Sequence, residues 1–245
     1  DANNLVSEVN NARDYSKKYT YNGLNKLKTA TDERNNTTTY DYYPGGLLKT
    51  VSDAKGNPTG YTYNELNKIE TITDAIGQTT TYTYDSMGRL DTLRDHRDVW
   101  TKYTYTSRDQ VANTYDSLDN FTQKLYYPSG DLWKAIDQEN RLTEYKYDAG
   151  HRLTSITQPG GYATNFMYDS VTGDIKRKYD NAGTYTDFEY DAMHRVLKEM
   201  NQQGHTTSYS YDVAGNLTSK TTPDGNTVTY THDELGRITS ILDPE

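Results

Sequence analysis

A pattern of 21 residues recurs along this chain and limits what the chain can fold into. The stretch from Tyr209 to Thr229, YSYDVAGNLTSKTTPDGNTVT, holds two alternating runs and two turn-like clusters, and Tyr230 begins the pattern again. The step is 21 residues throughout, except for one step of 22 between Phe166 and Phe188. The other starting residues, read upstream, are Tyr145, Lys124 in an otherwise aromatic place, Tyr103, Tyr82, Tyr61, Tyr40 and Tyr19. Such self-similarity predicts a tandem array in which each repeat is stabilised by its neighbours.

We expect the array to form a single domain over residues 1–245. Residues 1–18 are expected to be a truncated leading repeat, because Val6 falls where later repeats place Leu27, Leu48 and Ile69. The following repeats start at residues 19, 40, 61, 82, 103, 124, 145, 166, 188, 209 and 230.

A threonine-rich alternating run opens each repeat, as in TTTYTY at residues 79–84. Alternation of β-branched and aromatic residues is typical of a strand. Side chains alternate between the two faces of a strand, so Tyr82 and Tyr84 share one face, which we expect to be packed. The third place of the repeat is tyrosine until His232 replaces it in the last copy. The tyrosines of this place are Tyr21, Tyr42, Tyr63, Tyr84, Tyr105, Tyr126, Tyr147, Tyr168, Tyr190 and Tyr211.

Two four-residue turns follow in each repeat, a first turn such as Asp85-Ser86-Met87-Gly88 and a second turn such as Asp53-Ala54-Lys55-Gly56. Aspartate at the first corner can accept backbone N–H groups, and glycine at the fourth tolerates the left-handed conformation of a type I turn followed by a bulge. The glycines with this structural role are Gly46, Gly88, Gly130, Gly173, Gly215 and Gly236 in first turns, and Gly56, Gly77, Gly161, Gly183, Gly204 and Gly225 in second turns. Asn25, Asn67, Asp109, His151 and His194 replace glycine in other first turns, and we predict positive φ for all five.

The second strand of each repeat begins with an apolar residue such as Leu48, and a second apolar place, as at Val51, follows three residues later. A spacing of three puts the two side chains on opposite faces unless a bulge intervenes, so the pattern leaves their faces open. No segment between turns is long enough for a helix. The prediction is an all-β fold, a spiralling antiparallel sheet of hairpins with about 22 short strands.

Composition favours a folded protein with a thin apolar layer. Leu, Ile, Val and Phe make up about 15% of the chain, a share at which disorder becomes a concern. The 25 tyrosines and the modest net charge of −9 argue against disorder. The acidic balance and dispersed basic residues argue against a nucleic-acid partner. There is no cysteine for a disulfide or thiolate site and no apolar run long enough for a membrane span.

The elements YTYDSMGRL (82–90), YKYDAGHRL (145–153) and YSYDVAGNL (209–217) closely resemble the YD repeats of the Rhs, or rearrangement hot spot, proteins. That family includes bacterial polymorphic toxins, wall-associated proteins, the B and C components of insecticidal toxin complexes, and teneurins. The resemblance covers essentially the whole chain. It implies hairpins joined side by side in a spiralling sheet, part of a hollow shell that in the toxins encloses a toxic polypeptide. We carry over the scaffold and neither the toxicity nor an autoproteolytic cleavage.

No catalytic, cofactor or metal site is predicted. The turn aspartates lack the dense clustering of a calcium loop, and capping of the turn explains each of them. The histidines stand in turns (His96, His151, His194, His205) or in a tyrosine place (His232). Carboxylate pairs such as Asp187 with Glu189, or Asp95 with Asp98, could be drawn as a glycosidase pair, but carboxylates are too frequent here for specificity.

The leading hypothesis is a non-enzymatic scaffold, a segment of a secreted or surface-displayed bacterial shell. The partners implied are other repeats of a larger parent shell and an enclosed polypeptide such as a toxin. The alternative is an adhesion module that binds a cell-surface glycan or protein through the tyrosine-rich face, since aromatic rings stack on sugars. A hydrolase is the weakest class. Self-association through open sheet edges is a further prediction.

Overall fold

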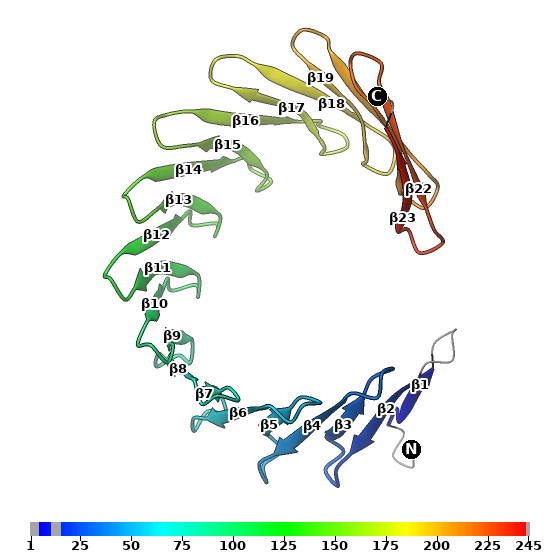
Figure 1. Cartoon of the computed structure of the whole chain (residues 1–245). Coiled ribbons are helices and arrows are strands. Elements are labelled where there is room, and N and C mark those ends of the chain that lie inside the picture. Colours follow the sequence, from blue (N-terminus) through cyan, green and yellow to red (C-terminus); the bar gives the residue numbers. More distant parts are fainter. Residues whose placement is uncertain (1–4, 11–15, 244–245) are drawn as a thin grey trace. The chain divides into compact units, whose positions relative to one another are not determined.

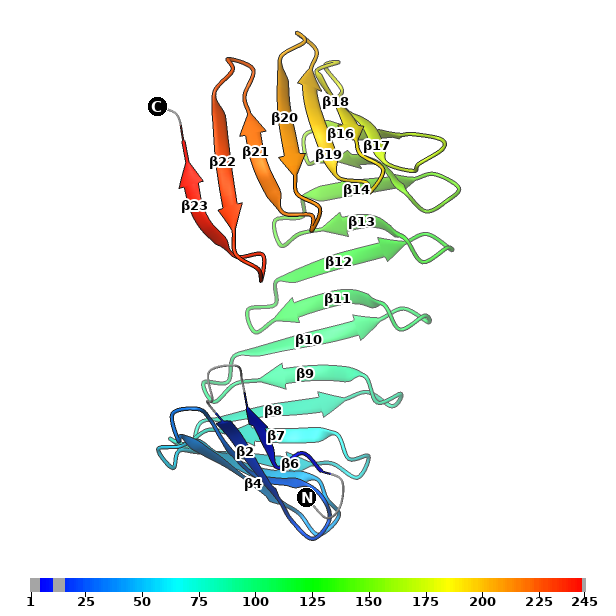
Figure 2. The same ribbon diagram turned by 90° about the vertical axis from the view of Figure 1, so that its right-hand side faces the viewer.

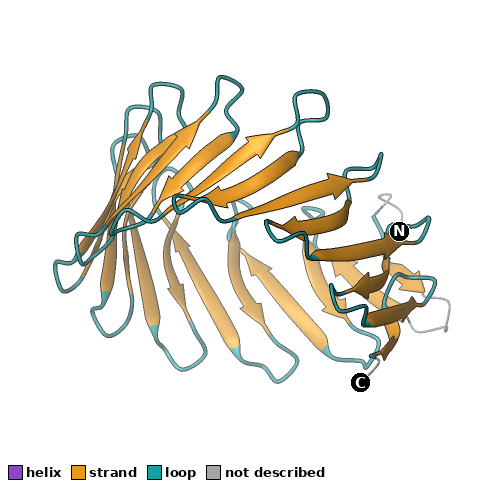
Figure 3. Cartoon of the chain, turned by 90° about the horizontal axis from the view of Figure 1, so that it is seen from above, coloured by secondary structure: helices purple, strands orange, loops and turns teal. Residues whose placement is uncertain are grey.

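The computed structural model describes residues 5–10 and 16–243, so part of the predicted leading repeat 1–18 lies outside the described residues. It contains antiparallel β-strands and, over the described residues, no helix (Figure 3). The 23 strands belong to one antiparallel sheet. Within each of the two compact units described below, a strand pairs with the next one along the chain, as β8 does with β9 and β14 with β15. The all-β prediction is confirmed, and the strand that exceeds the predicted number is β1 in the leading repeat.

The chain divides into two compact units, Asp1–Thr122 and Gln123–Glu245, called here the N-terminal and C-terminal halves. The N-terminal half contains β1 (Glu8–Asn10), β2 (Ser16–Tyr21), β3 (Leu27–Thr31), β4 (Thr37–Tyr42), β5 (Leu48–Ser52), β6 (Pro58–Tyr63), β7 (Ile69–Thr73), β8 (Thr79–Tyr84), β9 (Leu90–Arg94), β10 (Trp100–Tyr105) and β11 (Val111–Asp116) (Figure 1). β12 (Phe121–Tyr126) begins at the end of that half. The C-terminal half continues with β13 (Leu132–Ile136), β14 (Leu142–Tyr147), β15 (Leu153–Thr157), β16 (Ala163–Tyr168), β17 (Ile175–Asp180), β18 (Tyr185–Tyr190), β19 (Val196–Asn201), β20 (Thr206–Tyr211), β21 (Leu217–Thr221), β22 (Thr227–His232) and β23 (Ile238–Leu242).

A β-bulge follows each first turn and fixes the faces of the apolar residues. In the β8–β9 hairpin, Tyr84 lies opposite Leu90 and Thr83 opposite Thr92, so Asp91 is an extra residue in the ladder. The extra residue brings Leu90 and Leu93 onto the face that carries the tyrosines. The same register shift occurs in the β2–β3 and β20–β21 hairpins. Both apolar places of the second strand therefore lie on the tyrosine face, despite their spacing of three residues.

The second turns connect strands without such a shift. In the β7–β8 pair, Ile72 lies opposite Thr80 and Thr73 opposite Thr79. The Oγ1 atoms of Thr73 and Thr79 are 2.9 Å apart, a hydrogen bond that closes the end of the hairpin. First and second turns therefore lie at opposite ends of the strands, as the successive arrows of Figure 2 show.

The sheet is a single layer without a buried core. Among the described residues no apolar side chain is fully buried. Tyr82 and Tyr84 are half-buried, whereas Thr83 between them is exposed. The tyrosine face is thus partly covered by neighbouring side chains rather than by a second layer, in keeping with the shortage of aliphatic residues.

The turn geometry follows from the aspartate and the left-handed fourth residue. Gly88 donates its N–H to the Asp85 carbonyl (2.8 Å), and the Asp85 Oδ1 accepts the N–H groups of Met87 and Arg89 (2.9 Å each). Positive φ is confirmed for the five predicted residues that replace glycine, Asn25, Asn67, Asp109, His151 and His194, with values from 58° to 63°. Four further positive-φ residues of second turns were not predicted, Asn35, Asp98, Asp119 and Asn140. Their signal was present in the sequence, since all four are Asn or Asp in the place of the second-turn glycine.

Candidate functional site

The third-place tyrosine joins each repeat to the one before it. The Tyr84 hydroxyl donates a 2.7 Å hydrogen bond to the backbone carbonyl of Ile69, the first residue of the second strand in the preceding repeat. We call this bond the tyrosine staple. The same bond joins Tyr21 to Val6, Tyr42 to Leu27, Tyr105 to Leu90, Tyr168 to Leu153 and Tyr211 to Val196 at 2.6 to 2.9 Å. A bulge disrupts the local ladder at the accepting residue, and the phenol supplies a hydrogen-bond donor there.

For four of the stapled tyrosines, a cationic side chain of the preceding repeat covers the ring. The guanidinium carbon of Arg89 lies 4.6 Å from the ring centroid of Tyr105. The same guanidinium binds Asp85 in its own turn (2.7 Å) and Asp109 in the next repeat (2.6 Å). Equivalent cation–π contacts join Lys68 to Tyr84, Arg152 to Tyr168 and Arg195 to Tyr211. Arg89 therefore links three groups, namely its own turn, the next turn and the ring of the next stapled tyrosine.

The titration of these groups follows from their contacts. The pKa of the Asp85 carboxyl is lowered, chiefly because the carboxylate accepts the backbone N–H of Arg89 and then the Arg89 side chain. The pKa of Asp191 is lowered for the same reasons, with the Arg195 guanidinium as the main cause. Burial raises the pKa of the Tyr84 and Tyr105 phenols. The carboxylates are thus held charged and the phenols neutral, which suits a structural network.

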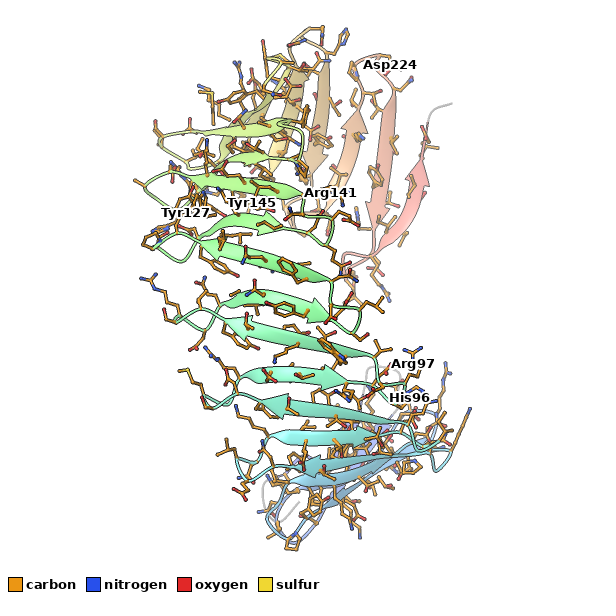
Figure 4. All side chains as sticks on the ribbon, turned by 90° about the vertical axis from the view of Figure 1, so that its left-hand side faces the viewer. His96, Arg97, Tyr127, Arg141, Tyr145 and Asp224 are labelled. Atoms are coloured by element: carbon orange, nitrogen blue, oxygen red, sulfur yellow. The ribbon has the colours of Figure 1, made fainter. Side chains whose placement is uncertain are left out.

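Two repeats carry Tyr-Pro in place of aspartate at the first turn. The Tyr127 hydroxyl donates to the Tyr145 carbonyl (3.2 Å), and its ring meets the Tyr147 ring edge-on, with centroids 6.2 Å apart. Tyr43 makes the same pair of contacts with Tyr61 and Tyr63. Figure 4 shows Tyr127 of a first turn and Arg141, which follows a second turn, at opposite ends of the strands. In these repeats the turn tyrosine provides the link between repeats.

The remaining third-place tyrosines, Tyr126 and Tyr190, also lie on the packed face. Tyr126 is opposite Leu132, and burial raises its pKa. Tyr190 contacts the Phe188 ring, with centroids 6.5 Å apart. The sequence pattern identified these tyrosines but not the acceptor carbonyls or the covering arginines. The four-residue offset between Asp85 and Arg89, repeated in Asp148–Arg152 and Asp191–Arg195, is the signal that could have indicated the ion pair.

Two depressions open on the first-turn side of the C-terminal half. One has a volume of about 530 Å³ and is lined by Tyr127, Pro128, Ser129, Asp131, Lys146, Tyr147, Asp148, Ala149 and His151. The other has a volume of about 220 Å³ and is lined by Asp169, Thr172, Asp174, Lys176, Phe188, Tyr190 and Asp191. In the first, His151 Nδ1 lies 2.6 Å from Asp131 Oδ2. Asp174, which lines the second, has both carboxylate oxygens 2.9 Å from Nδ1 of His194.

The carboxylate pairs considered from the sequence each hold separate cations. Asp187 binds Arg177 (2.5 Å) and Glu189 binds Lys198 (2.8 Å). Asp95 binds Arg97 and Asp98 binds Arg94. Within residues 5–10 and 16–243, no three His, Asp or Glu side chains come together as a metal would require. Nor does that part of the chain contain a helix long and apolar enough to cross a membrane.

The sequence of the chain matches the model of a known protein family. The RHS Repeat family model matches residues 67–98, 115–163, 196–227 and 211–245, together more than half of the chain. No curated protein sequence matches the chain.

Several solved structures have a similar fold over most of this chain. They include TcdB2-TccC3-Cdc42 (TM-score 0.63, 14% identity, 92% of this chain and 15% of that one). The Tc holotoxin pore of Photorhabdus luminescens is also similar (TM-score 0.64, 13% identity, 97% of this chain and 16% of that one). TcdB2-TccC3 without its hypervariable C-terminal region gives a TM-score of 0.64 at 14% identity, over 93% of this chain and 16% of that one. At these identities the likeness concerns the fold, and this chain spans about one sixth of the length of those chains. On the family match and the repeat geometry together, the chain belongs to the RHS repeat family.

Proposed function

We propose that the chain is a structural scaffold, a segment of a Rhs/YD-repeat shell that encloses or presents another polypeptide, such as a toxin domain. The single observation that supports this most is the staple from Tyr84 to the Ile69 carbonyl, repeated along the array. Each staple extends the sheet by one repeat without requiring a buried core. An array that extends in this way is expected to form a sheet one layer thick.

Several tyrosine side chains make their contacts with neighbouring residues of the sheet. Tyr105 carries Arg89 on its ring and bonds the Leu90 carbonyl through its hydroxyl. Tyr168 and Tyr211 are engaged in the same way. Rings covered by guanidinium groups offer less surface for sugar stacking, which supports the scaffold over the glycan-binding alternative.

The carboxylates support a non-catalytic role. The turn aspartates cap backbone N–H groups or bind arginine, and the pairs Asp187–Arg177 and Glu189–Lys198 are separate ion pairs. A general acid–base pair needs one carboxyl group with a raised pKa, whereas the pKa of Asp187 is lowered by Arg177.

The comparisons support a place within a larger assembly. The similar structures include TcdB2-TccC3 complexes and a Tc holotoxin pore, and this chain spans 15% to 16% of their length. The corresponding partners here are further repeats of the parent shell and a polypeptide inside it. Secretion from a bacterium is part of the proposal.

Limited proteolysis of the native protein that carries these repeats tests enclosure. We expect the polypeptide segments outside the repeats to resist an added protease until denaturant opens the sheet, with fragments identified by mass spectrometry. The same segments, expressed alone, are the control and should be cleaved at once. Equal cleavage rates in the native protein and in isolation would refute enclosure.

A further inference from the structure

Two repeats of the C-terminal half lack the cation that covers the next tyrosine. In the repeats that start at residues 145 and 188, the residue after the left-handed place supplies it, with Arg152 over Tyr168 and Arg195 over Tyr211 at 4.6 and 4.7 Å. In the repeats that start at residues 124 and 166, the same place holds Asp131 and Asp174. The tyrosines that follow are Tyr147 and Tyr190.

Both depressions of the C-terminal half lie at these substitutions. The larger one, of about 530 Å³, is lined by Asp131 and Tyr147. The smaller one, of about 220 Å³, is lined by Asp174 and Tyr190. In both repeats, the depression lies where an arginine would otherwise cover the next tyrosine. The two repeats are not adjacent in the chain.

The chain itself shows what binds at this place. Arg89 stacks on Tyr105, binds the carboxylates of Asp85 and Asp109, and donates to the Thr106 carbonyl (3.3 Å). By repeat position, the counterparts at the smaller depression are the Tyr190 ring, the Asp169 carboxylate and the Asp191 backbone, with His194, which binds Asp174, in the place of Asp109. The counterparts around the larger one are the Tyr147 ring, Tyr127, the Asp148 backbone and His151.

The substituting aspartates add negative charge to these places. The pKa of Asp131 is lowered by its hydrogen bonds with His151 and Ser129, and the pKa of Asp174 by those with His194 and Thr172. Both carboxylates are therefore ionised at neutral pH. Lys146 and Lys176 also line the depressions, and both are exposed to solvent.

We propose that each depression is a binding site for a guanidinium group, supplied by an arginine side chain of a partner polypeptide. The arginine would stack on Tyr147 or Tyr190, as Arg152 and Arg195 stack on the tyrosines of neighbouring repeats. It would pair with Asp131 or Asp174, the carboxylates that stand in the place of those arginines. Four strand steps separate β14 from β18, roughly 19 Å along the sheet. An extended partner segment spans that distance with two arginines about six residues apart. The inference stands independently of enclosure, since it concerns two sites on one half of the chain.

Calorimetric titration with a glycine–serine peptide that carries two arginines six residues apart tests the proposal. The decisive variant is the double substitution Asp131→Arg and Asp174→Arg. It restores the motif arginine at both places, so it should fold and should fill both depressions from within. We expect it to bind the peptide at least about tenfold more weakly than the wild type, a factor that corresponds to about 1.4 kcal/mol.

Matched controls separate this from general electrostatics. Asp224→Asn, in a second turn, removes another carboxylate whose pKa is lowered by hydrogen bonds, chiefly that with Thr222, and that does not line either depression. This substitution should leave binding unchanged. A citrulline peptide, uncharged but of the same shape, should not bind. If circular dichroism shows that the double arginine variant has not folded, the double variant Asp131→Asn and Asp174→Asn is used in its place. We expect the double asparagine variant to bind the peptide more weakly than the wild type as well. Unchanged affinity of the folded variants, equal binding of the citrulline peptide, or no binding by the wild type would each overturn the proposal.

Discussion

The hydroxyl of Tyr84 donates to the backbone carbonyl of Ile69, 15 residues earlier, across the boundary between two repeats. The same offset joins Tyr211 to Val196. Hydrogen bonds of this kind join successive repeats in a sheet that has no fully buried apolar side chain among its described residues. The staple accounts for tyrosine in this place, because phenylalanine would fill the space without donating to the carbonyl.

Removing one staple should weaken the sheet measurably. We expect Tyr84→Phe to lower the free energy of unfolding by about 1 kcal/mol, since the Ile69 carbonyl loses its donor. Urea titration followed by circular dichroism measures the change. Tyr82→Phe is the matched control, because within the described part of the chain the Tyr82 hydroxyl has no hydrogen-bond partner. Equal effects of the two substitutions would show that the staple does not stabilise the sheet.

The left-handed turn residue should be sensitive to a side chain even where space is free. Gly225 has φ of 89°, and nothing lies within 4 Å of the Cβ that alanine would add. Gly225→Ala should therefore cost about 1–2 kcal/mol of stability through backbone strain alone. Gly45→Ala is the control, since that position also has open space but no positive φ. If both variants unfold at the same urea concentration, backbone conformation is not the cause.

Acid should destabilise the array through its turn aspartates. The pKa values of Asp85, Asp148, Asp191, Asp212 and Asp233 are lowered by backbone and side-chain hydrogen bonds. A carboxyl group whose pKa is lower in the folded state contributes stability above its unfolded value, about 3.9, and loses that stability as the pH falls through the folded value. The urea midpoint should therefore be constant from pH 7 to about 5 and fall below about 4.

Asp212→Asn checks the origin of this acid sensitivity. Asn22 and Asn64 occupy the same corner in other repeats and accept the same backbone N–H groups, so asparagine should preserve the turn. The variant should match the wild type at pH 7 and show a smaller loss at low pH, because one titrating group is gone. An unchanged pH dependence would assign the acid sensitivity to other groups.

The final strand should promote self-association. All five residues of β23 are exposed, and Ile241 and Leu242 are 59% and 68% exposed. An apolar edge strand is a template for pairing with a second chain. Sedimentation velocity should show concentration-dependent association, which Ile241→Lys should reduce. A monomer at every concentration would contradict this prediction.

Much of the fold followed from local sequence, because each hairpin is closed by its own turn. Alternation predicted the strands, and Asp, Gly, Asn and His at the fourth corner predicted the left-handed turns. The staple could not be predicted, since a phenol's acceptor depends on where the bulge in the preceding repeat places the Ile69 carbonyl. The role of Arg89 was missed for the same reason: its three partners lie in two repeats and meet only when the sheet forms.

The two depressions could not be predicted from the repeat pattern either. In the sequence, Asp131 and Asp174 are two of many aspartates close to turns, each directly after a first-turn glycine. Their significance depends on the arginine that occupies the same place elsewhere and on its position over the next tyrosine, as for Arg195 and Tyr211.

Small-angle X-ray scattering of the purified chain tests the central claim, a folded sheet one layer thick, most directly. A compact globule of this length has a radius of gyration of about 18 Å and an unfolded chain one of about 54 Å. We predict a value clearly above the first and below the second, together with a β-sheet circular dichroism spectrum. A radius of gyration near 18 Å would mean that the chain packs as a solid globule and would contradict the account.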